Sequence, residues 1–179
     1  MLRPYIWHLT QKENAMNPNL SILEQAKVVV GLPPRTPSTS TPDYVSMKGY
    51  SRCAVLIVVD NATTVTGSAI TLKQAQAVAG TGEKALALPT AHRNIDTDAA
   101  DALAAFDVTS DTFTTDATNA KNLLYVADVK AEDLDVDNGF DCIRAGAGDA
   151  TAAVLAILYI LYGARYTVDG QASPSAILD

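Results

Sequence analysis

The residues best suited to chemistry lie in an acidic loop, residues 132–139, where Asp133, Asp135 and Asp137 alternate with apolar residues. Alternate aspartates resemble the start of a calcium loop, which needs oxygen ligands at positions one, three and five, a glycine at six and a glutamate at twelve. Counted from Asp133, these last two positions hold Asn138 and Arg144. Aspartates in such segments also close turns by accepting backbone hydrogen bonds. Turns are favoured, and a cation held by the three aspartates is the weaker alternative.

Other constellations that could carry a reaction are incomplete. The two histidines are His8 and His92, and the two cysteines are Cys53 and Cys142, at spacings that match no zinc ligand set. Neither histidine lies in a recognisable nucleophile and base pattern. The glycines near residues 80–84 and 146–148 lack the spacing of phosphate-binding loops. We therefore expect neither enzymatic activity nor a cofactor.

The charge distribution argues against nucleic acid and membrane partners. The net charge of the chain is -7, and residues 1–44 hold four Lys/Arg against three Asp/Glu, so the remainder carries -8. Phosphate backbones and anionic lipids are bound by clustered lysine and arginine, which this chain lacks. The first residues do not resemble a signal peptide. We expect folding in a reducing cytoplasm, with Cys53 and Cys142 as free thiols.

The most apolar stretch is Ala152–Tyr162, which contains no charged residue. It is shorter than the roughly 18 residues that span a bilayer, so it predicts no membrane anchor. Its second half is β-branched and aromatic, which favours a strand over a helix. Because both faces of that strand are apolar, we predict a central strand covered on nearly all sides.

The remaining patterns predict a mainly β chain. Strand-like segments bounded by turn signals lie at 52–60, 84–88, 108–115, 121–130 and 140–145. One short helix is expected over 71–79, because Thr71 and Gln74 have the spacing of a capping box and good helix formers follow. We predict a single antiparallel β-sandwich, jelly-roll-like, over residues 44–168.

An extended N-terminal arm, residues 1–43, and an extended C-terminal tail, residues 169–179, are expected to flank this body. Prolines at 33, 34, 37 and 42 exclude a helix there. The arm is either a loose tether or a segment laid across a neighbouring subunit, and we expect it to become ordered only on that partner. The candidate partner-binding residues are Val28, Val29, Val30 and Leu32. Met16 is a plausible second start.

Several segments from Asp43 onward resemble a family of small proteins encoded by tailed bacteriophages and prophages. The resemblance covers the body and, more loosely, the arm from Met16. It rests on the segments 44–48, 65–69, 72–75, 78–86, 133–144, 163–166 and 173–177, with sequences such as Asp133-Leu-Asp-Val-Asp-Asn-Gly-Phe-Asp-Cys-Ile-Arg144.

This resemblance implies a virion structural protein of the head region, assembled in the host cytoplasm. The expected role is a capsid decoration or cementing protein that attaches to the head through its body and arm. Its partners would be the major capsid protein or other virion subunits, and we expect a homo-oligomer. The alternatives are a neck, tail or vertex-spike component and, in another class, a module that binds a host protein or a glycan.

Overall fold

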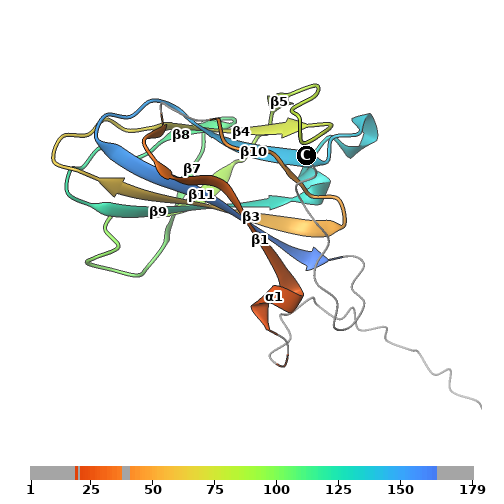
Figure 1. Cartoon of the computed structure of the whole chain (residues 1–179), viewed down its shortest axis with the longest axis horizontal. Helices are drawn as coiled ribbons and strands as arrows, with labels where there is room; N and C mark the ends of the chain where they lie inside the picture. The colour runs from red at the N-terminus through yellow and green to blue at the C-terminus, as the bar shows by residue number, and fades with distance from the viewer. Residues whose placement is uncertain (1–18, 20, 38–40, 165–179) are drawn as a thin grey trace, which may run out of the picture.

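Two antiparallel β-sheets packed face to face form the molecule, as the computed structural model shows for residues 19, 21–37 and 41–164 (Figure 1). Sheet A has the strand order β1 (Ala26–Arg35), β11 (Ala153–Ala164), β3 (Tyr50–Asn61), β9 (Asn122–Lys130), β6 (Thr90–Asn94) and β7 (Ala104–Asp107). Sheet B has the order β2 (Val45–Ser46), β10 (Cys142–Ala147), β4 (Ala69–Ala75) and β5 (Lys84–Ala85), and β8 (Thr112–Thr114) also pairs with β4. The prediction of a single β-sandwich is confirmed.

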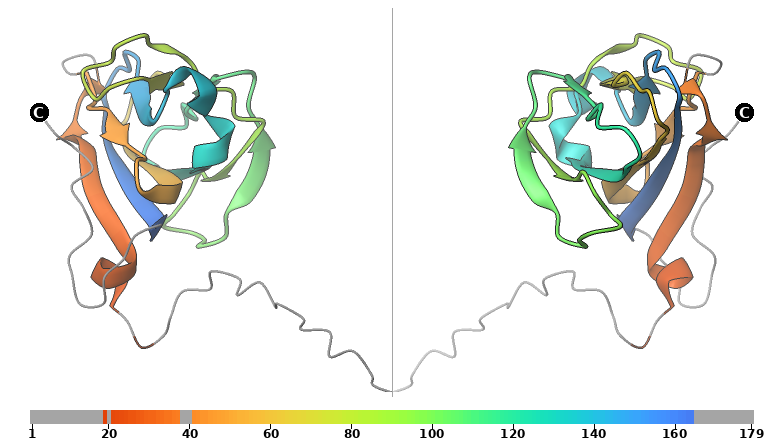
Figure 2. Two further views of the ribbon diagram at one scale, coloured as in Figure 1. Left: turned by 90° about the vertical axis from the view of Figure 1, so that its right-hand side faces the viewer. Right: turned by 90° about the vertical axis from the view of Figure 1, so that its left-hand side faces the viewer.

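The helical elements with bounds in the described residues are short. They are α1 (Ile22–Gln25), just before β1, and the 3-10 turns η2 (Ala131–Asp133) and η3 (Val136–Asn138), which form the acidic loop. Figure 2 shows the sandwich from its two ends, with α1 and β1 at one flank. The acidic loop therefore folds as two turns between β9 and β10.

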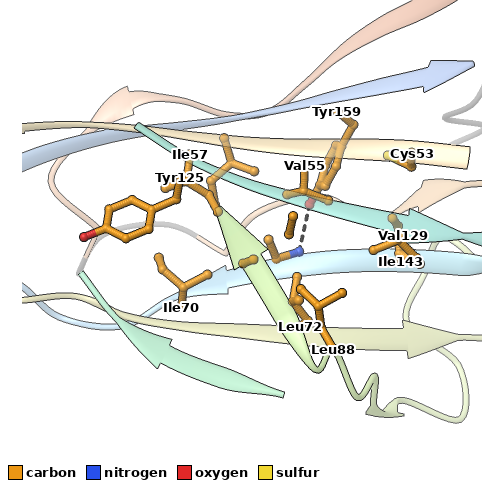
Figure 3. Close-up of a cluster of buried hydrophobic side chains, with 14 of the residues drawn as sticks. Cys53, Val55, Ile57, Ile70, Leu72, Leu88, Tyr125, Val129, Ile143 and Tyr159 are labelled. Atoms are coloured by element: carbon orange, nitrogen blue, oxygen red, sulfur yellow. Dashed lines mark hydrogen bonds between the residues drawn. The ribbon is translucent and has the colours of Figure 1, made fainter. Parts of the chain in front are cut away.

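Strand β11 contains the apolar stretch and lies inside sheet A, between β1 and β3. Its inward side chains, Leu155, Ile157, Tyr159 and Leu161, are at most 1% exposed. They pack against residues of sheet B, including Ile70, Leu72 and Ile143 (Figure 3). The predicted strand inside a sheet is confirmed, but the expected covering on nearly all sides is not, because only its inner face is buried and its outer side chains are partly exposed.

The helix expected over 71–79 is wrong, because the segment begins as strand β4. Ile70, Leu72 and Gln74 alternate toward the core, and β4 pairs with both β10 and β8. This burial with a period of two, together with two ladders of backbone hydrogen bonds, outweighs the helix propensity of the sequence. After β4 the chain turns at Gly80 and Gly82, which both have positive φ.

The prediction of an extended arm over residues 1–43 is wrong for residues 26–35, which form edge strand β1 of the chain's own sheet A. β1 pairs antiparallel with β11, and it buries Ala26 and Leu32 to 2% and 1% exposure. Burial of these side chains and pairing with β11 offset the cost of ordering the segment. Pro33 and Pro34 are tolerated because they lie at the end of an edge strand. Residues 1–18 and the expected tail, 169–179, lie outside the described residues.

A register shift in β1 decides which of its side chains enter the core. Val28 pairs with Ile160 and Val30 pairs with Leu158. The register then shifts by one residue between Val30 and Leu32, so Leu32 lies opposite Ile157. Without this bulge, Leu32 would lie on the same face as Val30, because side chains alternate along a strand. The bulge occurs at Gly31, where an added Cβ would lie 2.2 Å from the ring of Tyr159.

Tyr159 joins three parts of the molecule through its buried hydroxyl group. The amide of Ala145 in β10 donates to this hydroxyl at 3.0 Å, and the hydroxyl donates to the carbonyl of Asp43 at 3.2 Å. Asp43 in turn donates its amide to the carbonyl of Gly31 at 3.0 Å. Figure 3 shows the Tyr159 side chain reaching from sheet A toward sheet B. One side chain thus links β11, β10 and the chain that follows β1.

We expect Leu32→Ala to destabilise the isolated protein by about 2 to 5 kcal/mol, the usual cost of removing a fully buried leucine side chain. Leu23→Ala is the matched control, since Leu23 is 68% exposed and should change the free energy of unfolding by less than about 0.5 kcal/mol. Denaturant unfolding would measure both. Equal, small effects would mean that β1 does not belong to the body's core.

We expect Tyr159→Phe to cost about 1 to 3 kcal/mol, because the buried amide of Ala145 would lose its partner. The matched control is Tyr162→Phe on the same strand. The Tyr162 hydroxyl donates to Asp128 at 2.8 Å in an exposed position, where water can replace it. Thermal unfolding of both variants would test the difference, and a Tyr159→Phe variant as stable as Tyr162→Phe would contradict the bridging role.

Candidate interaction surface

The outer face of sheet A is apolar across its four long strands. Reading across the sheet, Val30, Leu158, Leu56 and Val126 lie in one row of paired residues on β1, β11, β3 and β9. On one side of this row, Ala156, Val58 and Leu124 continue the pattern, and on the other side the row of Val28, Ile160 and Ala54 ends at Asp128 on β9. We call this surface the apolar outer face, and its residues are Val28, Val30, Ala54, Leu56, Val58, Leu124, Val126, Val154, Ala156, Leu158 and Ile160. None of them carries a charge.

These side chains are accessible in the isolated chain. Val28, Val30, Val58 and Val154 are 43%, 52%, 45% and 41% exposed, and the others are partly buried by their neighbours on the sheet. Contiguous apolar patches larger than a few hundred Å² usually mark a surface that contacts another molecule. The apolar outer face therefore has the character of an interface.

The outer face of sheet B is polar except for a small cluster of Tyr44, Ala75 and Cys142 at one end. Thr71, Lys73 and Arg144 point outward from β4 and β10, opposite to the buried residues of those strands. Lys73 forms an ion pair with Asp111 at 3.4 Å, and Arg144 pairs with Glu83 at 2.7 Å. Antiparallel sheets commonly have one face on the core and one in water, as sheet B does. Sheet A departs from this rule, so its composition needs another explanation.

Charged groups border one end of the apolar outer face, and they are paired within the chain. Arg52 forms an ion pair with Asp128, and Lys130 pairs with Glu132 at 3.3 Å. A small open hollow of about 150 Å³ lies between Ser51, Arg52, Lys130 and Glu132. Because each cation already has a carboxylate partner, this border offers no excess charge to a ligand.

The four predicted partner-binding residues of β1 separate into two pairs. Val28 and Val30 lie on the apolar outer face, whereas Val29 and Leu32 point to the core. Sequence reasoning recognised that both faces of 152–162 are apolar, but it assigned no partner-binding residue to β3, β9 or β11. The available signal was that 53–59 and 152–162 are apolar at every position rather than at alternate ones, which predicts strands that are covered on both sides.

The acidic loop uses its carboxylates on protein partners. Asp135 forms an ion pair with Lys84 and accepts two hydrogen bonds from the Asn138 amide, both at 2.9 Å. Asp133 accepts a hydrogen bond from the backbone amide of Lys130 at 3.3 Å. Asp137 is exposed in η3. The structure thus does not bring the three aspartates together around one point.

Among residues 19, 21–37 and 41–164, no group of three or more His, Cys, Asp or Glu side chains is placed to hold a metal ion. Cys53 and Cys142 are free and buried. Burial raises the pKa of the Cys53 thiol, and burial together with a hydrogen bond to Asp141 raises the pKa of Cys142 to about 12. Both thiols are therefore poor nucleophiles at neutral pH. His92 is exposed on β6.

We expect Asp135→Asn to lower the thermal midpoint at neutral pH, and the difference from wild type to shrink in acid. The Lys84 hydrogen bond holds the pKa of Asp135 below its ordinary value of 3.8. The stabilisation is therefore complete above that value and is lost as the pH falls through the lower pKa of the folded state. Thermal scans between neutral and strongly acidic pH would measure this, with the exposed Asp137→Asn as control. A large rise in midpoint on adding calcium would instead indicate a cation site.

No helix in the described part of the chain is long and apolar enough to cross a membrane. No protein-family model matches the sequence, and no curated protein matches it. One solved structure that resembles the fold is the crystal structure of the SPBc2 prophage-derived protein YomS, with 14% sequence identity and a TM-score of 0.39. The similarity covers 76% of this chain and 91% of that chain. A similarity of this degree carries no argument about function.

Proposed function

We propose that this protein is a structural component of a bacteriophage virion that decorates or cements the head. The observation that carries the proposal is the contrast between its two sheets. A compact sandwich with one polar face and one apolar face is suited to assembly, with the polar face in water and the apolar face against neighbouring subunits. The segments that resemble phage and prophage proteins, such as 133–144, supply the virion context.

Attachment to the head is proposed to use the start of β1 and the residues before it. Ile22 and Leu23 in α1 are 55% and 68% exposed, and α1 buries none of its residues. They lead directly into edge strand β1, whose second edge pairs with no strand among the described residues. An exposed edge can accept an added strand from a partner. Weak contacts of this kind become strong when many copies bind one lattice.

The rival roles are a neck, tail or vertex-spike component and a module that binds a host protein or glycan. Glycan sites generally present aromatic side chains to the sugar. The large exposed hydrophobic residues of the described chain are Ile, Leu and Val. The assembly role is therefore better supported than the glycan role.

The proposal predicts that the purified protein binds phage heads that lack it, in hundreds of copies per particle. Co-sedimentation followed by quantitative mass spectrometry would measure the copy number. Replacing both Ile22 and Leu23 by serine should weaken binding without changing the circular dichroism spectrum. Val136→Ser, in a loop residue that is 57% exposed, is the matched control. A copy number of five, six or twelve would indicate a vertex or neck position, and no binding would overturn the virion role.

A further inference from the structure

We infer that the apolar outer face of sheet A is covered by the same face of a second copy, so that the protein is a face-to-face homodimer. This pairing goes beyond the proposed attachment to heads and does not depend on it. The face lies on four strands of one sheet, and two such faces can pack as the two inner faces of the sandwich do.

The size of the face suits a stable dimer. β1, β11, β3 and β9 are 10, 12, 12 and 9 residues long. At about 4.8 Å between strands and about 3.3 Å per residue, the four strands with their polar ends cover roughly 700 Å² in projection, and the apolar part alone covers about 290 Å². Stable interfaces bury about 600 to 1,000 Å² per partner, with an apolar centre and a polar rim. One face against another therefore reaches the usual range when the polar border of the face forms the rim of the contact.

The electrostatics of the face favour a copy of this chain over a charged partner. Its centre carries no charge, so nothing on it would select a basic or an acidic surface. The whole chain has a net charge of -7. The charges at one end of the face are paired, Arg52 with Asp128 and Lys130 with Glu132, whereas Asp60 is exposed beside Val154 at the other end. Two copies can thus meet at the first end without bringing like charges into unpaired contact, while the two Asp60 carboxylates must stay in water at the rim.

The geometry of the face also suits an isologous contact. Sheets that pack face to face lie about 10 Å apart, with side chains from the two faces interdigitating. The outer face alternates small and large side chains: Ala54 lies beside Ile160, and Ala156 lies beside Val58. A twofold axis lets the larger side chains of one copy lie over the alanines of the other.

Sedimentation velocity and light scattering of the full chain across a concentration series would test the dimer. The expected mass is twice the chain mass of 18.8 kDa. Val58→Lys should weaken dimerisation by at least about 100-fold, because the charge would be buried in an apolar interface. Val58 is 45% exposed in the single chain, so a lysine there reaches water when the dimer dissociates.

Thr114→Lys is the control, because Thr114 is exposed on β8 of sheet B and the substitution adds the same charge. This variant should remain a dimer. If Val58→Lys fails to fold by circular dichroism, Val30→Lys on the edge strand tests the same face.

A wild-type protein that stays monomeric at all concentrations would overturn the inference. The inference would also be overturned if the Val58→Lys and Val30→Lys variants both fold and both remain dimers. If wild type is monomeric but Val58→Lys abolishes binding to heads, the face belongs to a head protein instead of a second copy. A dimer that binds no heads would support the inference while overturning the proposed function.

Discussion

The hydrogen bonds of the Tyr159 hydroxyl are the constraint on which the arrangement of the two sheets depends. A phenol oxygen buried in a β-sandwich must find partners, because an unpaired polar group in the core is costly. Here the partners are the amide of Ala145 in sheet B and the carbonyl of Asp43. Ala145 lies on the preceding strand, and Asp43 lies 116 residues before Tyr159 in the sequence. The requirement therefore fixes β11 against β10, and it also fixes the path of the chain after β1.

The same ring explains why β1 can close sheet A. Tyr159 pairs with Val29, and its ring occupies the space that a side chain at position 31 would need, so position 31 must be glycine. The bulge at Gly31 then turns Leu32 inward while Val28 and Val30 remain outward. Since a slip of one residue exchanges the two faces of a strand, this bulge determines both the core contact and the outer surface of β1.

Sequence reasoning predicts the strands that are uninterrupted apolar runs in the sequence, such as 53–59 and 152–162. It fails at Thr71–Ala75, because local helix propensity and a capping-box spacing compete there with pairing to β10 and β8, partners that no local pattern reveals. It also places all of residues 1–43 in an arm, because the pairing of 26–35 with β11 and the bulge at Gly31 are tertiary features. Of the predicted partner-binding residues, alternation alone would assign Val28, Val30 and Leu32 to one face, and only the bulge at Gly31 places Leu32 in the core.

The two-sided apolarity of β11 is the feature that the proposed dimer would explain. A strand inside a two-layer sandwich needs only one apolar face. Strands β4 and β10 of this chain follow that rule, because their outward side chains include polar and charged residues. The outward residues of β11, from Val154 to Ile160, are nevertheless apolar at each position, and so are their neighbours at Leu56 and Val126. Keeping such a face in water favours aggregation, whereas covering it with an identical face adds hydrophobic stabilisation to the fold. On this argument, one face of β11 packs in the core of the sandwich, and the other face packs against the second copy.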